Sequence, residues 1–277
     1  MSTLTAEPAN APISSDVVKV ERVTGARVLN SEWIKLRSLR STAVTLATAV
    51  SLMVAMGWII GWATDANWSD SSPEERASFS PVDVTLAGYY LAQLAVGVLG
   101  VLTVTGEYAT GMIRATFGAV PRRLPVLWAK STLYAGVTFV LMLAAGFAAF
   151  VGGQELLGTH GTDLSATGAV RAIVGVAGYL ALIGVFSVAL GFIVRSTGGG
   201  VAILCGLLLV VPTLGLLLPS SWRDHLLPYL PSNAGSTMFS ARTAPDALSA
   251  STSLLVLLAW VAAALAGAAV LVKRRDA

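Results

Sequence analysis

The sequence predicts an all-α integral membrane protein with six transmembrane helices and an N-terminal amphipathic helix at the membrane interface. Two observations predict this fold class: six long apolar runs, and a concentration of Lys and Arg in alternate connections. Hydrophobic residues make up 55% of the chain and charged residues only 12%. We expect a disordered cytoplasmic leader at 1–23, an amphipathic helix at 24–42 and a six-span domain at 43–277.

Each apolar run has the roughly 20 residues that a helix needs to cross about 30 Å of hydrocarbon. None carries a charge near its middle, where a charged side chain disfavours insertion by about 2.5–3.5 kcal/mol. The core of a soluble protein would not produce six such runs. The predicted spans are 43–63, 84–105, 131–151, 171–194, 200–218 and 252–272.

The charges predict the orientation of the chain. Fourteen of the 18 Lys and Arg residues lie in the N-terminal tail, the second and fourth connections and the C-terminus. By the positive-inside rule, both termini are therefore cytoplasmic. These basic residues adjoin span ends, where they contact membrane lipid head groups, so the net charge of +3 does not indicate nucleic-acid binding.

Within the N-terminal segment, apolar residues recur at helical spacing, and they are Ala26, Leu29, Trp33 and Leu36. Arg27 and Lys35 fall on the opposite face. This pattern predicts a helix along the inner membrane surface. It serves either as a simple anchor or as an anchor that also contacts a cytoplasmic protein.

The connection at 106–130 contains the residues most relevant to function. It offers Glu107 and Tyr108 at the exit of a span, then Gly111, then a short amphipathic stretch that includes Phe117. One interpretation is a solvated loop whose arginines only fix the topology. The other is a short helix, parallel to the membrane, that exposes apolar side chains to an attached protein.

This connection resembles that of the permease subunits of bacterial type-2 ABC exporters. The resemblance is carried by the Glu-Tyr pair, the Gly and Ile-Arg that follow it, the Pro-Arg-Arg cluster at 121–123 and Lys130. The resemblance extends to the six spans, the amphipathic helix and the long outer connection before the last span. Met112 departs from it, because many members of the family have Thr there. The family implies export across the bacterial plasma membrane.

The resemblance implies two segments that dock on a separate ATPase. It makes 106–130 the coupling loop and 24–42 the connecting helix. The implied coupling contacts are Glu107, Tyr108, Gly111, Arg114 and Phe117, and those on the connecting helix are Trp33, Lys35 and Arg37.

The chain has no predicted catalytic, cofactor or metal site of its own. No G-x-x-x-x-G-K-[ST] phosphate-binding motif occurs, so ATP and Mg would be held by a partner ATPase. His160 and His225 lack metal-ligand spacing. Six spans are half of the usual membrane assembly of this family, which implies a second permease copy, either identical or related.

The outer connection at 219–251 is too polar and too rich in proline to span the membrane. It is either an interfacial cap or a re-entrant segment at the end of a pathway. The candidate outer-gate residues are Trp222, Leu226 and Tyr229.

Two other functions stay open: an ion-coupled secondary transporter and a polytopic membrane protein without a transport role. An ion-coupled carrier usually has an ionisable residue near the membrane midplane, and the spans contain none there. Their polar residues are expected to form helix-helix hydrogen bonds instead, and include Gln93, Thr103, Thr105, Ser187 and Thr213. The cargo is not predicted beyond a preference for a hydrophobic or amphipathic molecule, with a polysaccharide carrier as a neighbouring alternative.

Overall fold

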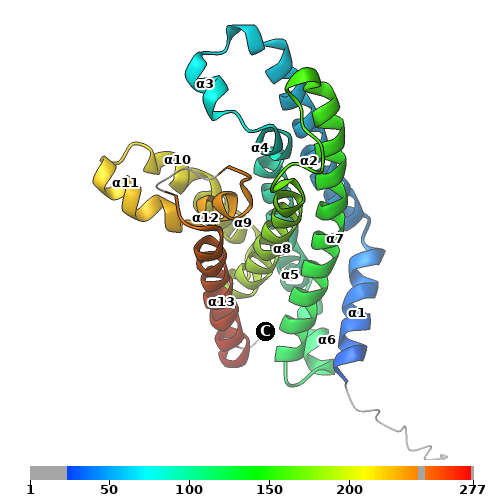
Figure 1. Cartoon of the computed structure of the whole chain (residues 1–277). Helices are drawn as coiled ribbons and strands as arrows, with labels where there is room; N and C mark the ends of the chain where they lie inside the picture. Colours follow the sequence, from blue (N-terminus) through cyan, green and yellow to red (C-terminus); the bar gives the residue numbers. More distant parts are fainter. Residues whose placement is uncertain (1–23, 243–246, 276–277) are drawn as a thin grey trace, which may run out of the picture.

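The computed structural model describes residues 24–242 and 247–275, and these residues form only helices and their connections (Figure 1). Six helical stretches are long and apolar enough to cross a membrane, which confirms an all-α fold with six candidate spans. They are α2 (Arg40–Ala66), α4 with α5 (Pro81–Ala109), α7 (Leu124–Leu156), α8 (Ala169–Val194), α9 to α10 (Thr197–Gly215) and α13 (Ala250–Arg274). The predicted leader lies outside the described residues.

Shorter helices flank the candidate spans. They are α1 (Gly25–Ser38), α3 (Pro73–Ser78), α6 (Met112–Ala119), α11 (Ser220–Leu226) and α12 (Pro231–Phe239). Figure 1 shows α1, α6 and the last turn of α13 at one end, here called the α6 end, and α3 at the other end, called the α3 end. The α6 end therefore brings together three segments that are far apart in the sequence.

Most of the helices extend beyond the predicted apolar runs. The loop predicted at 106–130 is mostly helical, because α5 (Tyr89–Ala109) continues into it, α6 lies within it and α7 begins at Leu124. Hydropathy marks only the apolar part of a helix, whereas backbone hydrogen bonds continue through the polar turns at its ends. The fifth span is shifted by three residues relative to its predicted range, 200–218.

Helix α8 is the centre of the bundle. In its most apolar stretch, 78% of the residues are buried, compared with 17% in α2, 22% in α9 to α10 and 28% in α13. Helix α8 packs against α5, α7 and α13. The outward faces of the three peripheral spans are thus left for lipid or for another subunit.

Two of the five polar side chains noted in the spans connect different helices. The hydroxyl of Tyr179 in α8 donates to the Gln93 side-chain oxygen in α5, and the Thr197 hydroxyl donates to Thr105 Oγ1 over 2.9 Å. The hydroxyls of the other three donate to carbonyls of their own helices, and these are Thr103, Ser187 and Thr213. The expectation of interhelical bonds therefore holds for Gln93 and Thr105.

Two spans are interrupted. Gly88, between α4 (Pro81–Leu86) and α5, lies so close to α2 that an added Cβ would be 2.2 Å from the Met53 carbonyl oxygen. In the fifth span, a π-helical turn at Gly206–Val210 separates α9 (Thr197–Cys205) from α10 (Val211–Gly215). Pro212 explains this turn, because proline has no N–H and its ring clashes with the carbonyl four residues earlier.

At the α3 end, polar contacts tie the segment after α12 to the bundle. Asp83 of α4 accepts hydrogen bonds from the Ala241 backbone N–H over 2.8 Å and from the Ser240 hydroxyl over 2.9 Å. Arg171 of α8 donates to the carbonyls of Met238 and Ser240. The segment that follows α12 is thereby held against α4 and α8.

The contact between α2 and α4 leaves no room for a side chain at Gly57. An added Cβ there would be 2.3 Å from the Thr85 carbonyl oxygen, whereas one at Gly136 of α7 would meet nothing within 4 Å. We expect Gly57→Ala to lower the melting temperature in detergent, because overpacking costs about 1–3 kcal/mol. Gly136→Ala is the matched control and should match the wild type or exceed it slightly. Equal melting temperatures for the two variants would contradict this packing.

Candidate functional site

Helix α1 presents an unexpected face to the bundle. It packs against α7, and its most buried side chains are Val28 and Glu32, which are 5% and 3% exposed. Leu29 and Trp33, predicted on the apolar face, are 40% and 42% exposed. Lys35, predicted on the opposite polar face, contacts residues of α5 and α6 instead. The apolar face of α1 is therefore only partly covered: Leu36 packs against the core, whereas Leu29 and Trp33 stay exposed.

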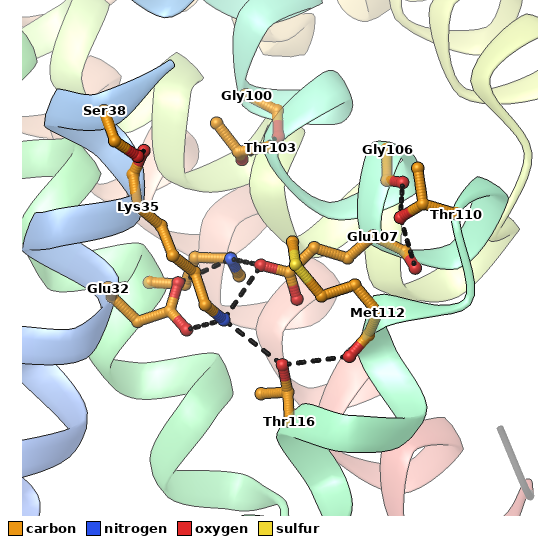
Figure 2. Close-up of polar contacts among 11 residues, drawn as sticks. Glu32, Lys35, Ser38, Gly100, Thr103, Gly106, Glu107, Thr110, Met112 and Thr116 are labelled. Carbon is orange, nitrogen blue, oxygen red and sulfur yellow. Dashed lines mark hydrogen bonds and ion pairs between the residues drawn. The ribbon is translucent and has the colours of Figure 1, made fainter.

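Four charged side chains from three helices form a closed cluster that we call the ion ring: Glu32 and Lys35 of α1, Glu107 of α5 and Lys130 of α7. Lys130 Nζ lies 2.6 Å from Glu32 Oε2 and 2.8 Å from Glu107 Oε1. Lys35 Nζ lies 2.8 Å from Glu32 Oε1 and 3.1 Å from Glu107 Oε1 (Figure 2). Each lysine thus bridges both carboxylates.

The ion ring is buried and electrically balanced. Glu32, Glu107 and Lys130 are at most 5% exposed, and the Lys35 side chain is 24% exposed. Removing one charge from water costs several kcal/mol, which only close and complete pairing can offset. The two lysines and two glutamates balance one another's charge, so the loss of any one leaves an uncompensated buried charge.

The pKa of Lys35 reflects this environment. Burial by itself lowers the pKa, but the hydrogen bonds and negative charges of Glu32 and Glu107 outweigh burial and raise it above the ordinary value of 10.5. Lys35 is therefore protonated at neutral pH. Its pairing contributes stability that is fully present below pH 10.5 and is lost as the pH rises above that value.

The ion ring also reaches α6. Lys35 Nζ donates to Thr116 Oγ1 over 3.2 Å, and the same hydroxyl donates to the Met112 carbonyl within α6. Between α5 and α6, Gly111 has a φ of 73°, a left-handed conformation that residues with a Cβ adopt only at a cost. This glycine turn and the Lys35 contact set the direction of α6.

Helix α6 has one buried face and one exposed face. Ile113 and Phe117 are 2% and 6% exposed, and the Arg123 guanidinium lies 5.5 Å from the centre of the Phe117 ring. Phe117 therefore anchors α6 to the bundle. The exposed residues of the helix are Met112, Arg114, Ala115, Gly118 and Ala119.

Tyr108 contributes to a second contact at the α6 end. Its ring lies 5.0 Å from the guanidinium carbon of Arg195, the residue that follows α8. Arg195 and Arg123 both donate to the carbonyl of Arg275, at the end of α13. Cationic side chains at a helix C-terminus satisfy its last carbonyls and interact favourably with its dipole. The end of α13 is thus tied to the connections that follow α6 and α8.

The other predicted residues lie apart from the ion ring. Trp33 and Arg37 line an apolar groove of about 820 Å³ between α1, α2 and α7. In and just after α11, the side chains of Trp222, Leu226 and Tyr229 lie on the surface, with exposed fractions of 62%, 49% and 50%. The carbonyl of Tyr229 accepts a hydrogen bond from the Trp260 indole over 2.9 Å, which ties this segment to α13.

From the sequence, neither Glu32 nor Thr116 was predicted as a site residue, and Lys130 was used only to assign the topology and the resemblance. A signal was present, since Glu32 and Lys35 are one helical turn apart and Lys130 lies inside a long apolar helix. A charge at such a position requires a partner of opposite sign. Glu107, the acidic residue near the end of α5, was the natural candidate.

The ion ring predicts a coupled effect of charge removal. We expect Glu32→Gln and Lys130→Met each to lower the free energy of unfolding by about 3–5 kcal/mol, because each leaves a buried charge unpaired. The double variant should lose much less than the sum of the two, which thermal unfolding in detergent measures. Lys273→Met, at an exposed position at the end of α13, is the control and should change little. Additive losses in the double variant would mean that the two side chains do not interact.

Comparison with known proteins assigns no family to the chain. No protein-family model matches it, and no curated protein matches it. The resemblance to exporter permeases therefore leads to a proposal, which depends on the ion ring and on α6.

Proposed function

We propose that this chain is the transmembrane permease subunit of an ATP-driven ABC exporter in a bacterial plasma membrane. A separate ATPase hydrolyses ATP and drives the movement, and a second permease copy completes the substrate pathway. One observation carries the proposal: α6 is firmly attached to the spans by one face and exposed on the other.

The attachments of α6 suit the transmission of force. The Gly111 turn joins α6 directly to α5, and the Thr116 hydroxyl joins it to Lys35 of α1. Through the ion ring, these helices are also bound to α7. A partner that moves the exposed face of α6 would therefore displace α1, α5 and α7 together.

The exposed face of α6 also suits a docking partner. Arg114 is flanked by small side chains, Ala115, Gly118 and Ala119. Small residues let a helix enter a groove on another protein, and an arginine can pair with a carboxylate at the rim of that groove. Basic residues at the α6 end, including Arg122 and Arg274, favour a cytoplasmic location for it, where ATP is present.

A second copy of the permease follows from the same proposal. Three spans have apolar outward faces that the rest of the chain leaves largely exposed: α2, α9 to α10 and α13. Two copies, identical or related, would enclose a pathway between such faces. ATP and Mg would bind the ATPase, because this chain has no phosphate-binding motif.

The position of the ion ring makes an ion-coupled carrier the weaker candidate. Glu107 lies two residues before the end of α5, and Lys130 lies within the first two turns of α7. Coupling ions are usually bound near the membrane midplane by residues that can change their charge. In this chain the buried carboxylates of the ion ring are paired with lysines, and they lie near the end of a span, as Glu107 does, or outside the six candidate spans, as Glu32 does.

The exposed face of α6 provides the test. We expect Arg114→Glu to reduce co-purification of the ATPase from the native membrane by about tenfold or more, because it places a like charge against an acidic rim. Insertion and melting temperature should be unchanged, since Arg114 is exposed. Mass spectrometry of the tagged permease and an ATPase assay on the complex measure the effect.

Arg274→Glu, at an exposed position on α13, is the matched control and should retain the ATPase. Recovery of the permease without any ATPase in repeated gentle preparations would overturn the proposal. Equal loss in both variants would show that charge at the α6 end matters but that α6 is not the docking element.

A further inference from the structure

An apolar groove of about 820 Å³ runs between α1 and the spans α2 and α7. Figure 1 shows α1 beside α7, with which it packs. The groove is open at the surface of the chain, because several of its lining side chains are exposed, among them Trp33 at 42% and Val140 at 64%. Its volume is within the range of about 300–1,000 Å³ that is typical of ligand sites. The groove is thus a surface site and not an enclosed cavity.

The groove extends from the edge of the membrane into a pair of spans. Its α1 residues precede Arg40, where the first candidate span begins. On α2 it reaches from Thr42 to Leu46, and on α7 it follows residues 132–141 for about 14 Å at 1.5 Å per residue. Both stretches belong to candidate spans. Membrane lipid therefore has direct access to the groove from its open side.

The walls of the groove are apolar over most of their length. They include Leu46 of α2 and Leu133 and Val137 of α7. The Thr132 hydroxyl, which also lines the groove, donates to the Trp128 carbonyl over 2.7 Å within α7, so it requires no partner from a ligand. These walls suit a hydrocarbon chain, which has no polar group that burial would leave without a hydrogen bond.

One positive charge borders this apolar surface. Among the described residues that line the groove, Arg37 is the only charged one, and no acidic residue is present. Arg37 is exposed and has no hydrogen bond or ion pair with any described residue. Arg40, three residues later, is exposed as well. Arginine forms short, often bidentate hydrogen bonds with phosphate, so a phosphate on the ligand would balance this charge.

The α1 side of the groove is suited to the head-group region of the membrane. Trp33 lies one turn before Arg37 and lines the same groove. Tryptophan prefers the interface between hydrocarbon and water, because its ring is apolar and its N–H is polar. Leu29, one turn earlier, is 40% exposed. A lipid in the groove would cover both side chains, which the described part of the chain leaves open.

We propose that this groove binds one anionic glycerophospholipid of the membrane. The phosphate pairs with Arg37, and an acyl chain lies between α2 and α7 against Leu46 and Val137. A zwitterionic lipid is a poorer ligand, since its ammonium group meets no carboxylate among the described lining residues and its net charge leaves Arg37 unbalanced. The inference goes beyond the proposed function and does not depend on it, because the lipid contacts a single chain.

The test uses the full chain without the ATPase, in vesicles that contain equal amounts of phosphatidylglycerol and phosphatidylcholine with the same acyl chains. The protein is released in neutral detergent, and native mass spectrometry counts the lipids retained per chain. We expect phosphatidylglycerol to be retained over phosphatidylcholine by about fivefold or more, which is the contribution of one arginine near an anionic lipid. Equal retention of the two lipids would overturn the proposal.

Arg37→Gln tests the contact with the head group. The change is at an exposed position, so the melting temperature should be unchanged. The preference for phosphatidylglycerol should disappear, while the acyl chains of both lipids still bind the groove. Arg274→Gln, at another exposed arginine of the α6 end, is the matched control and should keep the preference. A preference that persists without Arg37 would contradict the proposal.

Gly136→Phe locates the acyl chain. Gly136 lines the groove at an exposed position of α7, and an added Cβ would meet nothing within 4 Å, so a larger side chain has room to occupy the groove. We expect the retained lipid to be lost. Ala144→Phe, at an exposed position two turns further along α7 and outside the groove, is the control and should retain it. Undiminished retention by the Gly136 variant would place the lipid elsewhere and overturn the proposal.

Other occupants of the groove give different results. If a second copy of the chain covers it, Gly136→Phe reduces the proportion of dimers in the mass spectrum and leaves lipid retention unchanged. If the groove accepts any apolar molecule, the wild type retains both lipids equally. Either result overturns the proposal, and the Arg37 comparison decides it even where Gly136→Phe does not fold.

Discussion

The ion ring is the interaction on which the α6 end of this protein depends. Helix α1 has only two buried side chains, Val28 and Glu32, so apolar packing alone contributes little to its position. The contact that fixes it is electrostatic, between Glu32 and a lysine 98 positions away in the sequence. Because the four charges are removed from water together, each needs a partner of opposite sign, and the loss of a single one is costly. This makes the position of α1 conditional on the correct placement of α5 and α7.

The sequence predicted the fold class and the location of all six candidate spans, because hydropathy follows directly from composition. It predicted the faces of α1 and α6 poorly. Helical spacing grouped Leu29 and Trp33 correctly as neighbours, but it could not tell which side of the helix the bundle would cover. Phe117, which the resemblance implies as a coupling contact, is buried against the bundle. The ion ring required knowledge of which charges meet in space, and a single sequence does not contain it.

Above the ion ring, the bundle is held together by close backbone packing around α8. Gly57 and Gly88 bring α2, α4 and α5 into direct backbone contact, where an added methyl group would collide with a carbonyl oxygen. Interhelical polar contacts such as Tyr179 with Gln93 add direction to this packing. The α6 end and the centre of the bundle are therefore stabilised differently. At the α6 end, long charged side chains connect the helices, whereas in the centre glycines let the helix backbones pack directly against each other.

The π-helical turn at Gly206–Val210 has a mechanical consequence. A π-turn accommodates one extra residue in a helix, and one residue corresponds to about 100° of rotation. If this extra residue were redistributed along the fifth span, α10 would rotate about its own axis while α9 kept its contacts with α5 and α8. Such a shift would change which face of α10 points away from the bundle without unfolding the helix.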